Sequence, residues 1–356
     1  MKVLICLATR PEVMKNYSIV KELKSRSIDV VVVHTNQHRD YSMNKVFFEE
    51  MGYSADYILK GQYKMGKAID YVIDVIKSEK PDWILVNGDT AGALVGALAG
   101  QYTDTKICHV EAGLRSFDKD MYEERNRMSV DGMAHLLLTY TKKQADYLKN
   151  NKELRGKIKF VGNTTVDLIH DFDSEIRAAS VLGHGINNYF YVTLHRKEFT
   201  DSKVRMIRVF GVLRRISEKH DIHMIFPVHP RTRDCAKRYD IDIEALCGDK
   251  VHCIKPVSAF ESLRYEMKAK MILTDSGCIQ EEACVFGVPC ITIRDNTERH
   301  ECVEAGINIV TGFKPTDIIN AVEDFLEEPP EKFPKLYGTY GVGRRIVDSL
   351  ITNLDK

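Results

Sequence analysis

The chain has 356 residues, 44% of them hydrophobic, which is enough for two domains that each bury a core. Lysine and arginine together number 51, as do aspartate and glutamate, so the formal net charge is zero. This balance disfavours nucleic acid or an anionic membrane as a partner, because such partners select a basic excess. A small anionic ligand stays compatible with it, since one pocket needs only a few local charges.

The cysteines and the apolar segments indicate in which cellular compartment the protein is found. The nine cysteines are scattered, odd in number and without zinc-like spacing, so we expect buried free thiols rather than a disulfide framework. The first apolar run ends at Arg10-Pro11, too early for a secretory signal, and we expect it to be a buried strand. No segment approaches the roughly 20 apolar residues of a membrane span. We therefore expect a cytoplasmic protein.

Short apolar runs alternate with helical stretches along the first half of the chain. Strands are expected at 3–7, 30–34, 83–86 and 106–110, and helices at 16–25, 44–51 and 91–100. This alternation predicts a parallel sheet with helices on both faces, and the nearly continuous Val, Ile and Leu in the strands fits burial on both sides. Gly92, Gly96 and Gly100 recur every fourth residue, which predicts close packing of that helix on the sheet.

The pattern restarts in the second half. Strands are expected at 159–161, 189–192, 223–227, 252–254, 271–274 and 290–293, and a helix at 278–286. A helical stretch over 166–182 and a turn-rich segment over 183–188 join the halves, and the segment 341–354 has the apolar period of an amphipathic helix. The sequence thus predicts an α/β protein of two doubly wound, Rossmann-like domains, 1–168 and 169–340, facing one cleft.

Polar groups stand at the predicted strand ends, where open α/β sheets bind their ligands. We expect them to line one cleft: Arg10, Asp89, Glu111, His195, His229 and Asp275-Ser276-Gly277.

Ser276-Gly277 opens a helix directly after a strand. Free backbone N–H groups, the positive end of the helix dipole and a glycine that permits close approach together predict a phosphate site. A plain helix N-cap is the alternative. Glu281 and Glu282 point about 100° apart on a helix, so only one can face a ligand, where it would suit ribose hydroxyls. The alternative for that glutamate is a solvated surface position. Arg10 and His195-Arg196 are further anion candidates, with a surface ion pair and a loop histidine as their alternatives.

Four carboxylates, those of Asp89, Glu111, Glu123 and Glu124, lie in or near strand-end loops. A carboxylate in a dry cleft can act as acid or base, whereas Asp89 could instead cap the next helix. Paired carboxylates could also serve glycoside hydrolysis or a metal, but no histidine cluster accompanies them. The first strand is not followed by GxGxxG, so a dinucleotide is disfavoured, and we expect neither metal nor cofactor.

Nine segments in chain order resemble the non-hydrolysing UDP-N-acetylglucosamine 2-epimerases. They are ATRPEVMK (8–15), NQHRDYSMNKVFFEEMGY (36–53), NGDT (87–90), HVEAGLRSFD (109–118), EERNR (123–127), GNTTVD (162–167), HRKE (195–198), TDSGCIQEE (274–282) and NTERHECVEAG (296–306). The resemblance implies a glycosyltransferase-B-like fold in which the C-terminal helix, 341–356, returns to the first domain.

The resemblance also implies an activity. Members interconvert UDP-GlcNAc and UDP-ManNAc by anti elimination of UDP to 2-acetamidoglucal and syn re-addition. It further implies a homodimer, a second UDP-GlcNAc as activator and a role in supplying surface polysaccharide or cell-wall glycan.

By resemblance, site residues carry over motif by motif. Catalytic positions are Asp89, Glu111, Glu123 and His195; UDP contacts are Arg10, His195, Ser276, Gly277 and Glu282. Positions without a firm role are Lys15, Arg127, Glu298 and Arg299, and activator positions are Gln37, His38 and His229.

The chain departs from the family pattern at several positions, among them Ala8 and Cys278 for Gly, and Tyr122 and His300 for Pro. Alternatives therefore stay open: an epimerase of a modified UDP-amino sugar, a hydrolysing epimerase that releases ManNAc and UDP, a glycosyltransferase of the same fold, or a non-catalytic binding protein. HVEAGLR favours the GlcNAc type, and the Gln37-His38-Arg39 segment disfavours the hydrolysing type.

Overall fold

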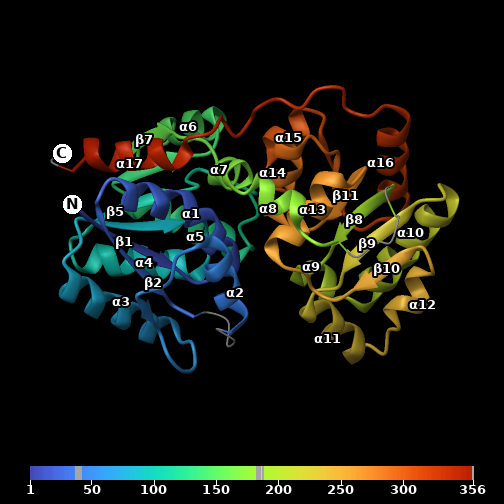
Figure 1. The fold of residues 1–356 in the computed structure, drawn as a ribbon, viewed down its shortest axis with the longest axis horizontal. Helices are drawn as coiled ribbons and strands as arrows, with labels where there is room; N and C mark the ends of the chain where they lie inside the picture. Colours follow the sequence, from blue (N-terminus) through green and yellow to red (C-terminus); the bar gives the residue numbers. More distant parts are fainter. Residues whose placement is uncertain (37–41, 182–185, 187, 355–356) are drawn as a thin grey trace. The chain divides into compact units, whose positions relative to one another are not determined.

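The computed structural model describes residues 1–36, 42–181, 186 and 188–354 (Figure 1). The chain forms two compact units: unit 1 comprises Met1–Asp171 with Tyr337–Lys356, and unit 2 comprises Phe172–Leu336. Each unit is built on one parallel sheet, as the sequence predicted.

Unit 1 holds a seven-stranded sheet in the order β3-β2-β1-β4-β5-β6-β7. Its strands are β1 (Lys2–Leu7), β2 (Asp29–His34), β3 (Tyr57–Ile58), β4 (Trp83–Asn87), β5 (Lys106–Val110), β6 (Leu136–Thr139) and β7 (Lys157–Phe160). Its helices are α1 (Arg10–Ser25), α2 (Ser42–Met51), α3 (Met65–Glu79), α4 (Ala91–Tyr102), α5 (Tyr122–Met133), α6 (Lys142–Lys149), α7 (Thr164–Asp171) and α17 (Val342–Thr352).

Unit 2 holds a six-stranded sheet in the order β10-β9-β8-β11-β12-β13. Its strands are β8 (Tyr189–Thr193), β9 (His223–Pro227), β10 (Val251–Ile254), β11 (Met271–Thr274), β12 (Cys290–Thr292) and β13 (Asn308–Val310). Its helices are α8 (Asp173–Ala178), α9 (Lys197–Thr200), α10 (Lys203–Lys219), α11 (Pro230–Arg238), α12 (Ile243–Cys247), α13 (Ala259–Lys268), α14 (Gly277–Phe286), α15 (His300–Glu304) and α16 (Pro315–Glu327).

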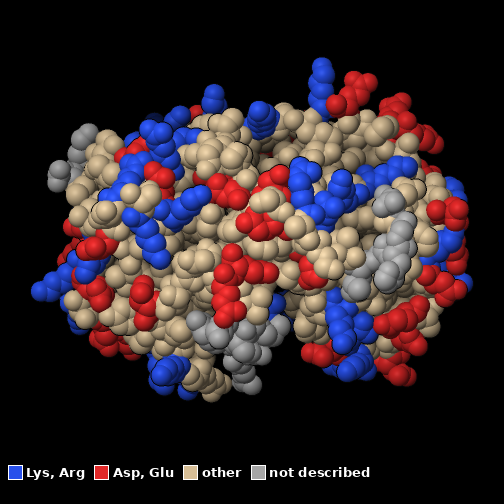
Figure 2. All heavy atoms as spheres, in the orientation of Figure 1, with Lys and Arg blue, Asp and Glu red and all other residues tan. Residues whose placement is uncertain are grey.

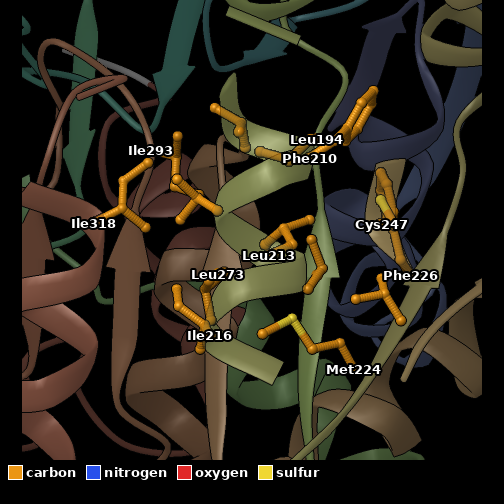
Figure 3. Packing of buried hydrophobic residues seen from close by; sticks show 14 of the residues in the cluster. Leu194, Phe210, Leu213, Ile216, Met224, Phe226, Cys247, Leu273, Ile293 and Ile318 are labelled. Carbon is orange, nitrogen blue, oxygen red and sulfur yellow. The ribbon is translucent and has the colours of Figure 1, made fainter. Parts of the chain in front are cut away.

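In both units the strand order reverses direction once, between β1 and β4 and between β8 and β11. Because parallel crossovers are right-handed, this reversal sends the helices to opposite faces of the sheet, which is the doubly wound arrangement. Figure 3 shows the unit 2 core, where Leu213 and Ile216 of α10 pack with residues of the strands. Both side chains are buried, so the apolar stripe of α10 fixes that helix on the sheet.

Helix α4 packs closely on the unit 1 sheet, as its glycine repeat predicted. A Cβ added to Gly96 would come within 2.6 Å of Val86 Cγ1 of β4, and one added to Gly100 within 2.7 Å of Ile84 Cγ2. Any side chain at these positions would push α4 away from the sheet. The start of α4 is thereby held close to β1 and β4.

The segment 166–182, expected to be one helix, is two: α7 ends at Asp171 and α8 begins at Asp173. The break falls where unit 1 gives way to unit 2. Asp171 accepts hydrogen bonds from Lys21 and Tyr340 of unit 1, whereas the Phe172 ring packs 5.0 Å from that of Phe260 in unit 2. The helix therefore breaks where the contacts of adjacent residues change from unit 1 to unit 2.

Helix α17 returns to unit 1 and packs against α1 and α7, as expected. Its start is anchored by Asp167, which accepts hydrogen bonds from the backbone N–H groups of Gly341, Val342 and Gly343. Among the described helices, none is long and apolar enough to cross a membrane. Basic and acidic side chains are mixed on the face shown in Figure 2, in keeping with the zero net charge.

Candidate functional site

The predicted site residues flank the points where strand order reverses. Arg10 opens α1 after β1, and Asp89 follows β4; in unit 2, His195 follows β8 and Ser276 follows β11. Loops that leave neighbouring strands toward opposite faces open a crevice at the carboxyl edge of a sheet. Each unit therefore presents its candidate residues where such a fold binds ligands.

Glu111 is a buried carboxylate of unit 1 with a constrained backbone. It directly follows β5 with a φ of +72°, a left-handed conformation that is unfavourable for residues other than glycine and recurs at functional sites. Its side chain is only 4% exposed and forms an ion pair with Lys15 of α1. A Cβ on Gly88 would lie 3.5 Å from Glu111 Oε2. The left-handed backbone of Glu111 and its ion pair with the buried Lys15 set the position of this carboxylate, and Gly88 lies beside it.

Asp89 is held by Arg127 of α5. The guanidinium donates from Nε to Asp89 Oδ2 at 3.1 Å and from Nη1 to Glu124 Oε2 at 2.9 Å. Thr90, not Asp89, caps α4 by accepting from the Ala93 N–H. The alternative that Asp89 is only a helix cap is therefore wrong.

Glu124 ties α5 to the loop that follows β5. Its carboxylate accepts from the backbone N–H of Ser116 at 2.8 Å and of Phe117 at 3.0 Å. Glu123, its neighbour in the first turn of α5, is half-buried. Because Arg127 bridges Glu124 and Asp89, α5 sets the position of two loops at once.

A buried polar cluster of His109, Asp131 and Arg115 connects the loop after β4 to α5. The His109 ring contacts Asp131 Oδ1 through Nδ1 at 2.8 Å and the Gly88 carbonyl through Nε2 at 2.9 Å. Asp131 also pairs with Arg115 at 2.7 Å. Burial opposes the ionisation of Asp131, but His109 and Arg115 keep its pKa below the ordinary value. Through its two ring nitrogens His109 joins the loop after β4 to α5.

Glu12 links the loops that carry Arg10 and Asp89. Its Oε2 accepts from the backbone N–H of Ala8 at 3.0 Å and of Thr9 at 2.8 Å, and its Oε1 accepts from the Thr90 hydroxyl at 2.9 Å. Burial raises the pKa of Glu12 to about 7 in spite of these hydrogen bonds. Arg10 itself is half-buried, with its guanidinium 5.6 Å from the centre of the Phe47 ring.

In unit 2, Asp275 joins the two predicted phosphate motifs. It is fully buried after β11, and its Oδ2 accepts from the backbone N–H groups of His195 and Arg196 at 2.8 Å each. Its Oδ1 lies 3.4 Å from His195 Nδ1. Burial raises the pKa of Asp275 to about 6, although the two N–H donors oppose this. Asp275 thus holds the backbone that carries His195 and lies beside the His195 imidazole.

His195 lies among cations. Burial and the charges of Arg196, Arg231 and Arg294 lower its pKa to about 4, so the imidazole of the free protein is neutral at pH 7. The side chain keeps a third of its surface, 33%, exposed and is therefore accessible to a ligand. A neutral histidine among arginines suits an anion, since a bound negative charge would raise the histidine pKa again.

The start of α14 is built around Arg299. Ser276 is the N-cap of α14, and its hydroxyl makes no capping hydrogen bond to the first turn. A Cβ on Gly277 would lie 2.8 Å from Arg299 Nη1, so only glycine fits beside this guanidinium. Arg299 donates to Glu281 at 2.9 Å and to Glu298 at 3.2 Å, and both carboxylates are buried.

The two adjacent glutamates of α14 diverge, as the helix geometry predicted. Glu281 is fully buried and neutralises Arg299, whereas Glu282 is 8% exposed and interacts with Glu266 of α13. The alternative of a solvated surface glutamate is wrong for both.

His229 caps α11 and is exposed, and its ring lies 5.1 Å from that of His195. The predicted activator position thus neighbours the predicted phosphate histidine. The other two activator candidates, Gln37 and His38, lie outside the described residues.

Sequence reasoning did not identify three supporting residues, Glu12, His109 and Asp131, whereas it placed Asp275 among the strand-end polar groups. Glu12 had a signal, because Thr9 and Glu12 form a T-x-x-E capping box. His109 and Asp131 had none, since their partners are distant in sequence. Among the described residues, no three His, Cys, Asp or Glu side chains group as a metal site requires.

Comparison with known proteins bears on this site. Residues 21–351 match the model of the family described as UDP-N-acetylglucosamine 2-epimerase. The chain is 39% identical, over 98% of both chains, to the UDP-N-acetylglucosamine 2-epimerase of Methanocaldococcus jannaschii. It is 35% identical, over 98% of its length and 99% of the relative, to the UDP-2,3-diacetamido-2,3-dideoxy-D-glucuronate 2-epimerase of Pseudomonas aeruginosa. The crystal structure of the M. jannaschii UDP-GlcNAc 2-epimerase in complex with UDP-GlcNAc and UDP matches 99% of this chain and 100% of that one, with a TM-score of 0.89 and 37% identity.

Proposed function

Because the chain belongs to the UDP-N-acetylglucosamine 2-epimerase family, we propose that it interconverts UDP-GlcNAc and UDP-ManNAc without net hydrolysis. The observation that carries this proposal is Glu111, a buried carboxylate held in a left-handed backbone conformation against Lys15. Strain of this kind persists only where the surrounding structure enforces it, and it concentrates at sites of chemistry.

Unit 2 supplies the UDP site in this proposal. The first turn of α14 receives the pyrophosphate, and His195 and the neighbouring arginines of unit 2 complement its charge. Charge develops on UDP as the C1–O bond breaks, so fixed donors at the phosphates stabilise that transition state. Glu282 takes the ribose hydroxyls.

Unit 1 supplies the proton transfers. The C2 proton of the sugar is not acidic, so C1–O cleavage runs ahead and leaves oxocarbenium character at C1. A base then takes the C2 proton to give 2-acetamidoglucal, and an acid returns a proton on the other face as UDP adds back. Two groups are therefore needed, and Glu111, Asp89 and Glu123 are the candidates. Lys15 and Arg127 hold the first two in place.

The test is incubation with UDP-GlcNAc in deuterated water, followed by proton NMR. UDP-ManNAc and UDP-GlcNAc that both carry deuterium at C2 are the expected products. Free ManNAc with UDP would place the protein with hydrolysing epimerases, and sugar transfer to an added acceptor with glycosyltransferases. A Glu111→Gln variant that exchanges C2 hydrogen as fast as the wild type would refute the assignment of that residue.

A second candidate substrate is a modified UDP-amino sugar, favoured by the 35% identity to the P. aeruginosa diacetamido-glucuronate epimerase. Its uronate would bring one more negative charge. Lys15 and Arg127, which flank the carboxylates, are already neutralised by Glu111 and Asp89, and this favours an uncharged sugar. Parallel assays with both UDP-sugars decide between them, since the true substrate has the larger kcat/KM.

We also propose, by family resemblance, a homodimer and activation by a second UDP-GlcNAc near His229. Light scattering tests the dimer. Sigmoidal dependence of rate on UDP-GlcNAc that becomes hyperbolic in His229→Ala is expected for activation, and hyperbolic kinetics in the wild type would contradict it.

A further inference from the structure

A buried side-chain amide lies at the start of α14, beside the turn that carries Ser276 and Gly277. Gln280 is 1% exposed, and its side chain folds back along the helix so that Nε2 donates to the Ser276 carbonyl at 3.1 Å. Its Oε1 accepts from Thr297 Oγ1 at 2.7 Å and from Asn308 Nδ2 at 3.0 Å. Three separate segments, the start of α14, the loop after β12 and strand β13, therefore meet at one amide.

The Ser276 carbonyl fixes the orientation of this amide. A carbonyl oxygen only accepts, so the amide nitrogen of Gln280 must face it, and the amide oxygen must face Thr297 and Asn308. Thr297 Oγ1 accepts from the backbone N–H of Arg299 at 3.1 Å and keeps its own hydrogen for Gln280. The hydrogen bonds thus leave one orientation of the Gln280 amide.

The Ser276 carbonyl belongs to the peptide group that opens α14. This peptide is trans and planar, so its carbonyl and the N–H of Gly277 point in opposite directions and turn together. The Gly277 N–H lies in the first turn, for which a helix itself provides no acceptor, and it points outward from the helix start. A hydrogen bond to the carbonyl holds the plane of the peptide and polarises the N–H as a donor. Gln280 therefore acts on the kind of group through which a helix start binds phosphate.

We propose that Gln280 is a positioning residue for the phosphate site: its amide holds the Ser276–Gly277 peptide in the orientation in which the Gly277 N–H faces the diphosphate of a nucleotide. The proposal rests on the proposed UDP binding at α14. Because the same amide binds Thr297 and Asn308, it joins the turn to the loop and the strand beside it, and the turn keeps its shape before the ligand arrives. Such preorganisation raises affinity, since less ordering is left for the binding step.

The test uses two variants that differ in what they can donate. Gln280→Met keeps the length of the side chain and removes all of its hydrogen bonds. Gln280→Glu keeps an acceptor for Thr297 and Asn308, but its carboxyl can donate to the Ser276 carbonyl only when it is protonated. UDP affinity is measured by calorimetric titration between pH 6 and 9, and the affinity for uridine, which has no phosphate, is measured by proton NMR titration.

We expect Gln280→Met to bind UDP about tenfold more weakly at pH 7, while its affinity for uridine stays within about twofold of wild type. Loss of the folded unit would weaken both ligands, so the difference between them reports the phosphate turn. The UDP affinity of Gln280→Glu, divided by that of the wild type at the same pH, should fall about tenfold as pH rises from 6 to 9. This ratio cancels the titration of UDP and of His195, so the fall marks ionisation of the introduced carboxyl.

Gln144→Met is the matched control, because Gln144 is also a buried glutamine in the first turn of a helix, here α6 of unit 1. Its Oε1 accepts from the backbone N–H groups of Tyr140 at 3.1 Å and Thr141 at 3.0 Å. This variant should lose stability in urea unfolding and keep the wild-type affinity for UDP. A lower UDP affinity in Gln280→Met alone therefore reports the position of the amide and not the loss of a buried amide as such.

Three results would overturn the proposal: a UDP affinity of Gln280→Met within about twofold of wild type, equal losses of UDP and uridine affinity in that variant, or a UDP affinity of Gln280→Glu that is lowered by one factor at every pH. Any of these, in a protein whose wild type binds UDP, would refute the role of Gln280 alone. Wild-type protein that binds no UDP would instead refute the proposed function, and the phosphate role with it.

Discussion

The Gly277→Ala variant tests how closely the start of α14 packs against Arg299. The added Cβ would lie 2.8 Å from Arg299 Nη1 and 3.0 Å from Cζ. The guanidinium cannot simply swing away, because Glu281 accepts from it at 2.9 Å and Glu298 at 3.2 Å, and Arg299 is 4% exposed. Gly277 does not have a positive φ, so alanine brings no backbone strain and the effect is that of the methyl group alone.

Overpacking of this kind lowers the free energy of unfolding by about 1–3 kcal/mol, whereas the higher helix propensity of alanine raises it by up to about 1 kcal/mol. We therefore expect a net destabilisation of about 1–2 kcal/mol in urea unfolding. UDP should bind at least about tenfold more weakly, because both the methyl group and the displaced guanidinium disturb the phosphate site.

Gly211→Ala is the matched control in the same unit. A Cβ there has no neighbour within 4 Å, and the residue lies within α10, so this variant should be neutral or more stable by about 0.5–1 kcal/mol. Gly277→Ala combined with Arg299→Lys should lose less stability than the sum of the single changes, since a slimmer side chain relieves the contact. Equal stability of Gly277→Ala and Gly211→Ala, with wild-type UDP affinity, would refute the reasoning.

Two further predictions concern unit 1. Glu111→Gln should lower kcat by about 10²–10⁴-fold in the C2 exchange assay while UDP affinity stays within about twofold, and a comparable loss of affinity would instead indicate a role in binding. Glu12 has a pKa raised to about 7, so its contribution to stability is present at lower pH and lost as pH rises through 7. Between pH 6 and 8 the free energy of urea unfolding of wild type should therefore fall by about 1 kcal/mol relative to Glu12→Gln, and parallel pH profiles would contradict this.

Most of the fold could be predicted from the sequence because its strands are buried on both faces. Such strands appear as continuous apolar runs, and β5, β9 and β11 have the predicted bounds. Short strands such as β3 and β13 were missed, since two or three residues carry no period of their own. The break at Phe172 was missed because Asp171 contacts unit 1 and Phe172 contacts unit 2, and these contacts are distant in sequence.

The sequence predicted the positions that are proposed to contact a ligand, and it predicted few of the residues that hold the strand-end loops. Ser276, Gly277 and Glu282 stand in a recognisable strand-turn-helix segment, so their types and spacing are informative. The contacts that hold the strand-end loops in place are not apparent from the sequence: Asp275 bonds to His195, 80 residues away, and Glu12 bonds to Thr90, 78 residues away. Local pattern cannot pair side chains at such separations.

The sequence by itself determined the alternation of strands and helices, the strand ends at which polar groups gather, and the motifs that resemble one family, because each depends on residues close together in the chain. Only the tertiary structure decided which carboxylates carry a partner: Glu111 has Lys15, Asp89 has Arg127, and Glu281 has Arg299. The charge, protonation and orientation of a buried carboxyl follow from the groups that fill the space around it, and packing alone brings those groups together.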